Sequence, residues 1–222
     1  MRPLIRAAGH EIWTPTYTGL GERAHLASPG IDLDTHVQDV TAVLDMEDLR
    51  DIVLIGHSYG GMVATGVADR ARNRMAQVIY LDAFVPRDGQ SLFDLQPPEA
   101  RERMRELART AGEGWRLPPN PMPPDTPAAD VAWAAPRRLP QPIKTFETPV
   151  RLSANAPPPR RYIYCQRNGP GDVFRQFLER AQREAGWRHF EIDASHNPHI
   201  TAPQALLALL NEIVATGAQI RP

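Results

Sequence analysis

Short apolar runs alternate with amphipathic stretches through most of the chain. The apolar runs are rich in β-branched residues and too short to be buried helices, so they predict parallel strands covered on both faces. The stretches between them repeat apolar residues at helical spacing, as Met62, Val63 and Val67 do, and predict helices. The expected strands are residues 11–15, 52–55, 77–82, 162–165 and 189–192, and the expected helices are residues 2–8, 34–44 (capped by Asp34 or Thr35), 60–71, 173–185 and 203–215.

The middle of the chain departs from this alternation. Sixteen of the 23 prolines lie between Pro86 and Pro159, and the same segment contains a charged helical pattern over residues 98–111. The order of elements predicts a mostly parallel, doubly wound α/β sheet that a Pro-rich helical insertion interrupts. We therefore expect one domain, with a core formed by residues 1–85 and 160–222 and a cap, or lid, formed by residues 86–159.

Composition narrows the class of protein. The 222 residues are 42% hydrophobic and 23% charged, as expected for one globular domain with a sizeable core. The 25 basic and 26 acidic residues are interleaved, so nucleic acid is not an expected partner. The sequence shows no membrane-spanning run or signal-peptide pattern, and its single cysteine, Cys165, excludes an internal disulfide. We expect a cytoplasmic protein with no membrane partner, metal or organic cofactor.

One pentapeptide carries the strongest chemical signal. Residues 56–60, Gly-His-Ser-Tyr-Gly, match the G-x-S-x-G pattern and fall between a predicted strand and a predicted helix. This context predicts a nucleophile elbow, a turn so tight that the neighbours of the serine must be small, as Gly56, Gly60 and Gly61 are. The turn presents the Ser58 hydroxyl at the carboxyl edge of the sheet. The N–H of Tyr59 would then donate to an oxyanion. His57 is adjacent to the serine and is therefore not its base. A chance glycine-serine turn that caps a helix is the competing interpretation.

A serine nucleophile needs a general base, which in this architecture follows the last strand. His196 lies between the strand at 189–192 and the final helix, and it is the predicted base, with His199 as the alternative. For the carboxylate that orients the base, we favour Asp82 over Asp172, because Asp82 ends an apolar strand where an unpaired carboxylate would be costly. Asp172 has a sufficient structural explanation as a helix N-cap. An ion pair with an arginine is the competing interpretation for both carboxylates.

The cap is expected to cover the serine and to form the substrate pocket. Its large apolar side chains could line that pocket, with prolines that hold its shape at low entropic cost. Alternatively, they seal only a small core of the cap itself. The pocket candidates are Trp115, Trp133 and Phe146 of the cap and Phe84 before it.

Four segments of the sequence resemble one family of enzymes. They are residues 19–23 (Gly-Leu-Gly-Glu-Arg), 32–36 (Asp-Leu-Asp-Thr-His), 56–62 (Gly-His-Ser-Tyr-Gly-Gly-Met) and 80–86 (Tyr-Leu-Asp-Ala-Phe-Val-Pro). The chain resembles bacterial α/β-hydrolases related to plant methyl-salicylate-type esterases and hydroxynitrile lyases, from Ile5 to about Val214, which implies the α/β-hydrolase fold. Some haloalkane dehalogenases of the wider superfamily carry their acid at the position that corresponds to Asp82, whereas similar plant members have aspartate near Asn168.

The resemblance also implies that the N-terminal side is truncated. Family members usually begin with a strand that ends in a His-Gly segment, whose loop supplies the second oxyanion N–H. Met1 falls inside the helix that follows that strand. We therefore expect a gap in the sheet between residues 11–15 and 52–55, and half of an oxyanion hole. Met1 would then be an internal methionine of a longer product, or the chain would be a short form with low activity.

Together these features predict a serine hydrolase, a carboxylesterase that cleaves a small, largely apolar ester through an acyl-enzyme on Ser58. One alternative is a hydroxynitrile-lyase-like reaction, with Ser58 and His196 as acid and base. That reaction also needs a lysine near the site, and Lys144 in the cap is the only lysine of the chain. Another alternative is a non-catalytic homologue that binds a ligand in the pocket without turnover.

Overall fold

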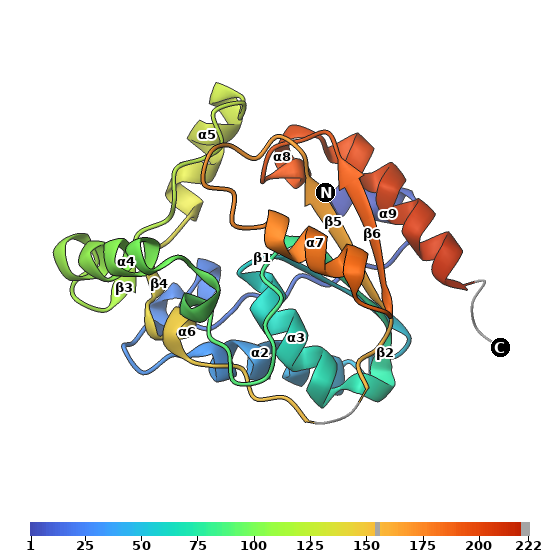
Figure 1. Cartoon of the computed structure of the whole chain (residues 1–222), viewed down its shortest axis with the longest axis horizontal. Coiled ribbons are helices and arrows are strands. Elements are labelled where there is room, and N and C mark those ends of the chain that lie inside the picture. The colour runs from blue at the N-terminus through green and yellow to red at the C-terminus, as the bar shows by residue number, and fades with distance from the viewer. Residues whose placement is uncertain (154–155, 219–222) are drawn as a thin grey trace.

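A computed structural model describes residues 1–153 and 156–218, in which a parallel sheet lies between layers of helices (Figure 1). Its strands are β1 (Ile52–Ser58), β2 (Met75–Ala83), β5 (Arg160–Cys165) and β6 (Trp187–Ile192). They pair in this order, and every pair is parallel. The predicted mostly parallel, doubly wound α/β sheet is confirmed.

Helices cover both faces of this sheet. They are α1 (Arg2–Ala7), α2 (Leu33–Met46), α3 (Gly60–Arg70), α7 (Arg175–Arg183) and α9 (Pro203–Ala218). Residues of α2, α3 and α7 share one core with Val78 and Tyr80 of β2, whereas residues of α9 share a second core with Ile79 and Leu81. Because alternate side chains of β2 point to opposite faces, one continuous apolar strand contributes to both cores.

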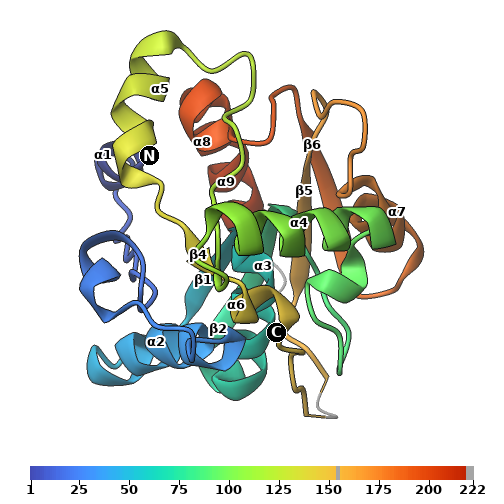
Figure 2. The same cartoon turned by 90° about the vertical axis from the view of Figure 1, so that its left-hand side faces the viewer.

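Between β2 and β5 the chain leaves the sheet and returns to it, as the side view shows (Figure 2). This segment contains α4 (Pro98–Ala111), α5 (Ala128–Ala134), α6 (Lys144–Glu147), the 3-10 turns η3 (Phe93–Leu95) and η4 (Ala135–Arg137), and a two-stranded antiparallel ribbon of β3 (Arg116–Leu117) and β4 (Gln141–Pro142). The helix predicted over residues 98–111 is present with those bounds. The remaining short elements are η1 (Gly21–Leu26), η2 (Arg72–Arg74) and α8 (Pro198–Thr201). Among the described residues, no helix has the length and apolarity to cross a membrane.

Two predictions on the N-terminal side were wrong. Residues 11–15 form no strand, because the described sheet places no hydrogen-bonding neighbour beside them. β1 is consequently an edge strand of the described sheet, and its Ile55 is 42% exposed. Helix α2 begins earlier than predicted, because Asp32 is its N-cap and forms a reciprocal capping box with Thr35.

Candidate active site

The Ser58 hydroxyl stands on a strained turn at the carboxyl end of β1. Ser58 is the last residue of that strand, and α3 begins two residues later at Gly60. The φ angle of Ser58 is +55°, in the left-handed region that residues other than glycine rarely adopt. Tyr59 is the N-cap of α3, so its N–H lies where the first N–H groups of a helix have no carbonyl partner within it. Backbone strain and free donors at one position are typical of a nucleophile elbow.

Two glycines near the serine are required by close packing. A Cβ at Gly61 would lie 2.1 Å from the carbonyl oxygen of Phe84, and one at Gly56 would lie 2.6 Å from the carbonyl oxygen of Gly60. At Gly60 itself, the nearest atom to a Cβ would be the Tyr17 hydroxyl at 3.6 Å, which is ordinary contact. The prediction that all three positions of the turn require a small residue is therefore wrong at Gly60, where a Cβ would fit.

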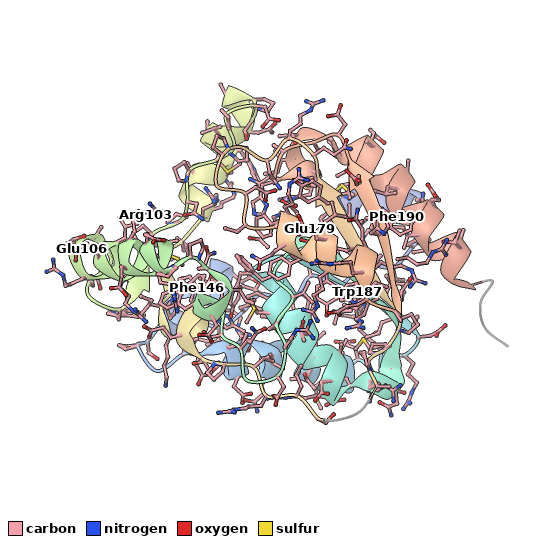
Figure 3. All side chains as sticks on the ribbon, in the orientation of Figure 1. Arg103, Glu106, Phe146, Glu179, Trp187 and Phe190 are labelled. Carbon is pink, nitrogen blue, oxygen red and sulfur yellow. The ribbon has the colours of Figure 1, made fainter. Side chains whose placement is uncertain are left out.

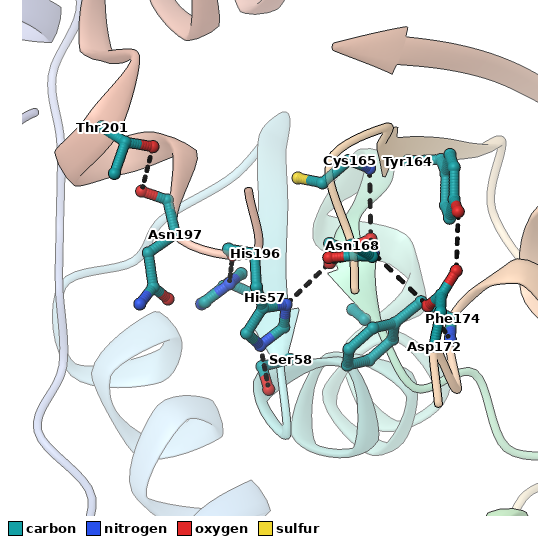
Figure 4. Close-up of polar contacts among 12 residues, drawn as sticks. His57, Ser58, Tyr164, Cys165, Asn168, Asp172, Phe174, His196, Asn197 and Thr201 are labelled. Carbon is teal, nitrogen blue, oxygen red and sulfur yellow. Dashed lines mark hydrogen bonds and ion pairs between the residues drawn. The ribbon is translucent and has the colours of Figure 1, made fainter. Parts of the chain in front are cut away.

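A chain of two hydrogen bonds joins Ser58 to Asp82 through His196 (Figure 4). Nε2 of His196 lies 3.1 Å from Oγ of Ser58, and Nδ1 lies 2.7 Å from Oδ2 of Asp82. In a neutral imidazole, an Nδ1–H that donates to the carboxylate leaves Nε2 as the acceptor for the serine proton. Ser58 lies at the end of β1, Asp82 near the end of β2, and His196 in the loop after β6. These three segments meet at the carboxyl ends of the parallel strands.

Asp82 reaches the imidazole because the ladder between β1 and β2 slips at this point. His57 pairs with Leu81, but Ser58 pairs with Ala83, so Asp82 is the extra residue of an irregularity of the β-bulge kind. Its φ angle is +41°, also in the left-handed region. Such a slip re-aims a side chain out of the regular alternation of its strand.

The Asp82 carboxylate is fully buried and well supplied with donors. The backbone N–H of Cys165 donates to Oδ1 at 3.2 Å, and Nδ2 of Asn168 lies 3.1 Å from each carboxylate oxygen. With His196, three residues donate hydrogen bonds to this carboxylate. These contacts offset the cost of burying an ionised group.

Asp172, the alternative acid, occupies a different part of the network. It accepts a hydrogen bond from the Tyr164 hydroxyl at 2.6 Å and another from the Phe174 N–H at 2.8 Å. Burial and the bond to Asp172 raise the pKa of Tyr164 to about 12, which fits its role as the donor. The N-cap of α7 is Phe174, so the prediction that Asp172 caps this helix directly was wrong. Asp172 instead closes a turn just before it.

Two aromatic neighbours position His196, and the sequence did not predict their contacts. The Phe174 ring stacks on the imidazole, with centroids 4.7 Å apart and an interplanar angle of 14°. His57 lies with its ring centroid 4.7 Å from that of His196 and donates from Nε2 to the His196 carbonyl oxygen at 2.7 Å. Burial, together with His196 and His199, holds the pKa of His57 well below its ordinary value, so His57 is a neutral donor. The position of His57 next to Ser58 was the only feature of the sequence that indicated a contact with the site.

An ion pair ties together the loops that carry Asn168 and His196. Arg167 makes a two-pronged contact with Asp193, at 2.6 and 2.7 Å, and its backbone N–H donates to the Ala194 carbonyl at 3.0 Å. An exposed ion pair contributes little to stability, but the paired geometry fixes the relative position of the two loops.

A cavity of about 890 Å³ is lined by Ser58 and His196 and by residues of the segment between β2 and β5. Residues 121–124 (Pro-Met-Pro-Pro), in the Pro-rich stretch at 120–125, and Trp133 provide apolar lining, while Asn120 and Asp125 at the two ends of that stretch are polar. Three arginines also line the cavity, Arg137, Arg138 and Arg167. The described residues contain no group of three histidine, cysteine or carboxylate side chains that could hold a metal ion.

Of the four predicted pocket residues, Trp133 lines this cavity and the others do not. Phe84 packs against two other phenylalanines in the core of the sheet. Phe146 lies on α6 (Figure 3). Its ring packs against that of Tyr59, and Trp115 lies beneath a guanidinium group next to β3. Phe84 and Phe146 lie in the apolar core, where burial removes their rings from water.

The chain belongs to the alpha/beta hydrolase family, whose model matches residues 1–209. The carbendazim hydrolyzing esterase of Nocardioides sp. is 35% identical to it over 214 residues, which cover 91% of this chain and 87% of that protein. The pFDCC methylesterase MES16 of Arabidopsis thaliana is 25% identical over 231 residues, covering 96% of this chain and 87% of that protein. The solved structure of an extracellular alpha/beta-hydrolase from a Paenibacillus species has a TM-score of 0.79 at 23% identity, and the match covers 95% of this chain and 90% of that one.

These relationships confirm the family resemblance that four sequence segments indicated. They also define the protein as an enzyme, a hydrolase of the carboxylic ester class.

Proposed function

We propose that this protein is a serine carboxylesterase that cleaves a small ester through an acyl-enzyme on Ser58. The observation that carries the proposal is the hydrogen-bonded chain from Ser58 through His196 to Asp82 at the wall of the cavity. A serine, a histidine that can accept its proton and a buried carboxylate behind that histidine are the groups that acyl transfer requires.

In the proposed mechanism, Nε2 of His196 takes the proton from Ser58 as Oγ attacks the ester carbonyl carbon. The negative charge that develops on the carbonyl oxygen is stabilised by the Tyr59 N–H at the start of α3. His196 then gives the proton to the alcohol oxygen, the carbon–oxygen bond breaks, and the acyl group remains on Ser58. Water, deprotonated by His196, then attacks the acyl carbon; the bond to Oγ of Ser58 breaks, His196 returns the proton to Oγ, and the acid is released. Asp82 keeps the imidazole in the useful tautomer and stabilises its charged form.

The relatives support ester cleavage, since two of them are named as an esterase and a methylesterase. The apolar lining at residues 121–124 and Trp133 suits a substrate with a largely apolar portion. The proposed partner is thus a small-molecule ester. The proposed location is the cytoplasm, because the lone Cys165 is a buried free thiol that suits a reducing compartment.

Lyase chemistry has no specific observation in its favour. Lys144, the lysine it would need, is the first residue of α6 and does not line the cavity. A non-catalytic homologue would bind a ligand in the cavity and would not hydrolyse any ester.

The test compares Ser58→Ala with Ser195→Ala in hydrolysis of a p-nitrophenyl ester. Ser195 also lines the cavity, and its buried hydroxyl has no hydrogen-bond partner in the described structure, so it is a matched control. We expect Ser58→Ala to lose about three or more orders of magnitude in kcat, as removal of a nucleophile does, and Ser195→Ala to keep the parent activity. A phosphonate should label Ser58 covalently in the parent. Equal rates for Ser58→Ala and the parent, or no turnover and no labelling of the parent, would contradict the proposal.

A further inference from the structure

The three arginines that line the cavity differ in whether a carboxylate neutralises them. Arg167 is paired with Asp193. The hydrogen bonds and charge of Asp193, and to a smaller extent the charge of Asp125, raise the pKa of Arg167. Asp125 is the carboxylate that lines the cavity, and it therefore acts on an arginine that already has an ion-pair partner. Arg137 and Arg138 form no ion pair with any residue that the structure describes. The cavity wall therefore carries uncompensated positive charge at these two positions.

Most of the N–H donors of the Arg138 guanidinium have no acceptor among the described residues. One of its guanidinium N–H groups donates to the Asn120 carbonyl at 2.5 Å, which links η4 to the Pro-rich stretch on the same cavity wall. A guanidinium has five N–H donors, and the described residues provide no acceptor for the rest of them. Partial burial lowers the pKa of Arg138 without a nearby carboxylate to oppose the shift. A partly desolvated cation of this kind is stabilised by an anion that enters the cavity.

Arg137, the preceding residue along the chain, lines the same cavity and contacts Trp133. Its guanidinium carbon lies 4.6 Å from the centroid of the Trp133 ring, and its Nη1 donates to the Trp133 carbonyl at 2.6 Å. Trp133 is 62% exposed although it borders the cavity. An apolar ring and two cations thus line the same cavity as Ser58.

We propose that the ester cleaved at Ser58 carries a carboxylate group away from the scissile bond, and that Arg138, with Arg137 beside it, binds this carboxylate. The substrate class is a hemiester of a dicarboxylic acid, whose apolar middle part contacts Trp133 and the Pro-rich stretch. A planar guanidinium fork matches a carboxylate with two parallel hydrogen bonds, which gives orientation as well as attraction. This inference rests on the proposed esterase function and refines the substrate for the same site.

The kinetic test uses phenyl hemiesters of succinate, glutarate, adipate and suberate, each matched to a neutral phenyl ester of the same chain length. We expect the parent to prefer one hemiester of the series over its neutral match, mainly through a lower KM. Arg138→Gln should lower kcat/KM for that hemiester by about tenfold to a hundredfold, the effect of losing a charge-assisted hydrogen bond, while the neutral ester is cleaved as before.

The matched control is Arg103→Gln. Arg103 is an exposed arginine of α4 outside the cavity lining (Figure 3). Because this substitution also replaces an arginine with glutamine, it makes the same change in net charge as Arg138→Gln. We expect this variant to keep the hemiester preference. A parent without that preference, or an Arg138→Gln variant that loses activity on both esters equally, would overturn the inference and leave the esterase proposal intact. The second result would show that Arg138 only joins two parts of the cap.

A binding measurement makes the inference independent of turnover. Ser58→Ala should bind the preferred hemiester in calorimetry, and the same variant with Arg138→Gln should bind it about tenfold or more weakly. Equal affinity in the two proteins would overturn carboxylate recognition by Arg138. If the parent cleaved no ester but Arg138 still governed hemiester binding, the esterase proposal would fail and the cavity would be a binding site for carboxylates.

Discussion

The Phe174 ring lies face to face with the imidazole of His196, at a centroid separation of 4.7 Å and an angle of 14° between the planes. Hydrogen bonds to Ser58 and Asp82 fix two points on the imidazole, whereas the stacked ring fixes its plane. Phe174 is itself buried and packs edge to face on Phe84. The apolar core of the sheet therefore extends to the proposed base and limits its rotation.

Loss of this stacking should affect the reaction more than the fold. We expect Phe174→Leu to lower kcat by about tenfold to a hundredfold, because a displaced base loses alignment with Ser58, at a cost of about 1 to 2 kcal/mol in the free energy of unfolding. Phe177→Leu is the control, since Phe177 packs on the same Phe84 ring and makes no ring contact with His196. Steady-state kinetics and thermal unfolding check the pair. Equal loss of kcat in both variants would mean that Phe174 acts only through core packing.

The carboxylate behind His196 gives a sharper contrast. In Asp82→Asn, an amide would replace the acceptor of the Nδ1–H and favour the tautomer in which Nε2 carries the proton. We expect kcat to fall by about three to four orders of magnitude, the effect seen when a triad aspartate is changed to asparagine. Asp172→Asn should leave kcat near the parent value, because Asp172 contacts Tyr164 and the Phe174 N–H. Single-turnover acylation rates would measure both, and near-normal rates in Asp82→Asn would reject Asp82 as the acid.

The sequence predicted the elements that depend on local pattern. The β-branched runs at residues 52–55, 77–82, 162–165 and 189–192 all lie in strands, although the observed strands are longer. β6 begins at Trp187 because this residue pairs with Arg160 on β5, and composition alone does not reveal such partners. The strand prediction at residues 11–15 was wrong for the same reason, since a strand-like pattern forms a strand only where a neighbouring strand pairs with it through hydrogen bonds.

The site was predictable where chemistry and chain order restrict it, and less so where packing decides. The Ser58 motif and the position of His196 after the last strand were readable from the sequence, and the structure brings both together with Asp82. The register slip that turns Asp82 toward the imidazole depends on the pairing of two strands, so no local signal reports it. The stacking of Phe174 likewise depends on the path of a loop.

Histidines near the cavity should make the fold sensitive to acid. Burial, followed by the charge of His196, lowers the pKa of His199 from 6.5 to about 4. Between these values the unfolded chain binds a proton at this position that the folded chain does not, so the free energy of unfolding falls as the pH drops through this range. The loss from His199 should be about 1 to 2 kcal/mol between pH 7 and pH 5.

Substitution of His199 separates this contribution from the rest. His199→Gln should show a smaller decrease in the free energy of unfolding between pH 7 and pH 5 than the parent, measured by urea denaturation at each pH. Part of the acid sensitivity should remain in the variant, because burial also depresses the pKa of His57. Parallel stability curves for parent and variant would show that His199 is as easily protonated in the fold as in the unfolded chain.

The two glycines that follow Tyr59 should respond in opposite ways to a methyl group. In Gly61→Ala the new Cβ would lie 2.1 Å from the Phe84 carbonyl oxygen, a backbone atom that cannot move aside without disturbing β2. The Phe84 N–H in turn donates to the Ser58 carbonyl, so the displacement reaches the nucleophile. We expect a loss of about 2 to 3 kcal/mol or more in the free energy of unfolding, together with lower kcat.

Gly60→Ala is the matched control, because the same methyl group at the start of α3 would meet only the Tyr17 hydroxyl at 3.6 Å. Alanine also reduces the entropy of the unfolded chain, so we expect stability to be unchanged or to rise by up to about 1 kcal/mol. Chemical denaturation and ester hydrolysis of both variants check the contrast. If Gly60→Ala destabilised the protein as much as Gly61→Ala, the close approach of α3 to Phe84 would not be what requires glycine at this turn.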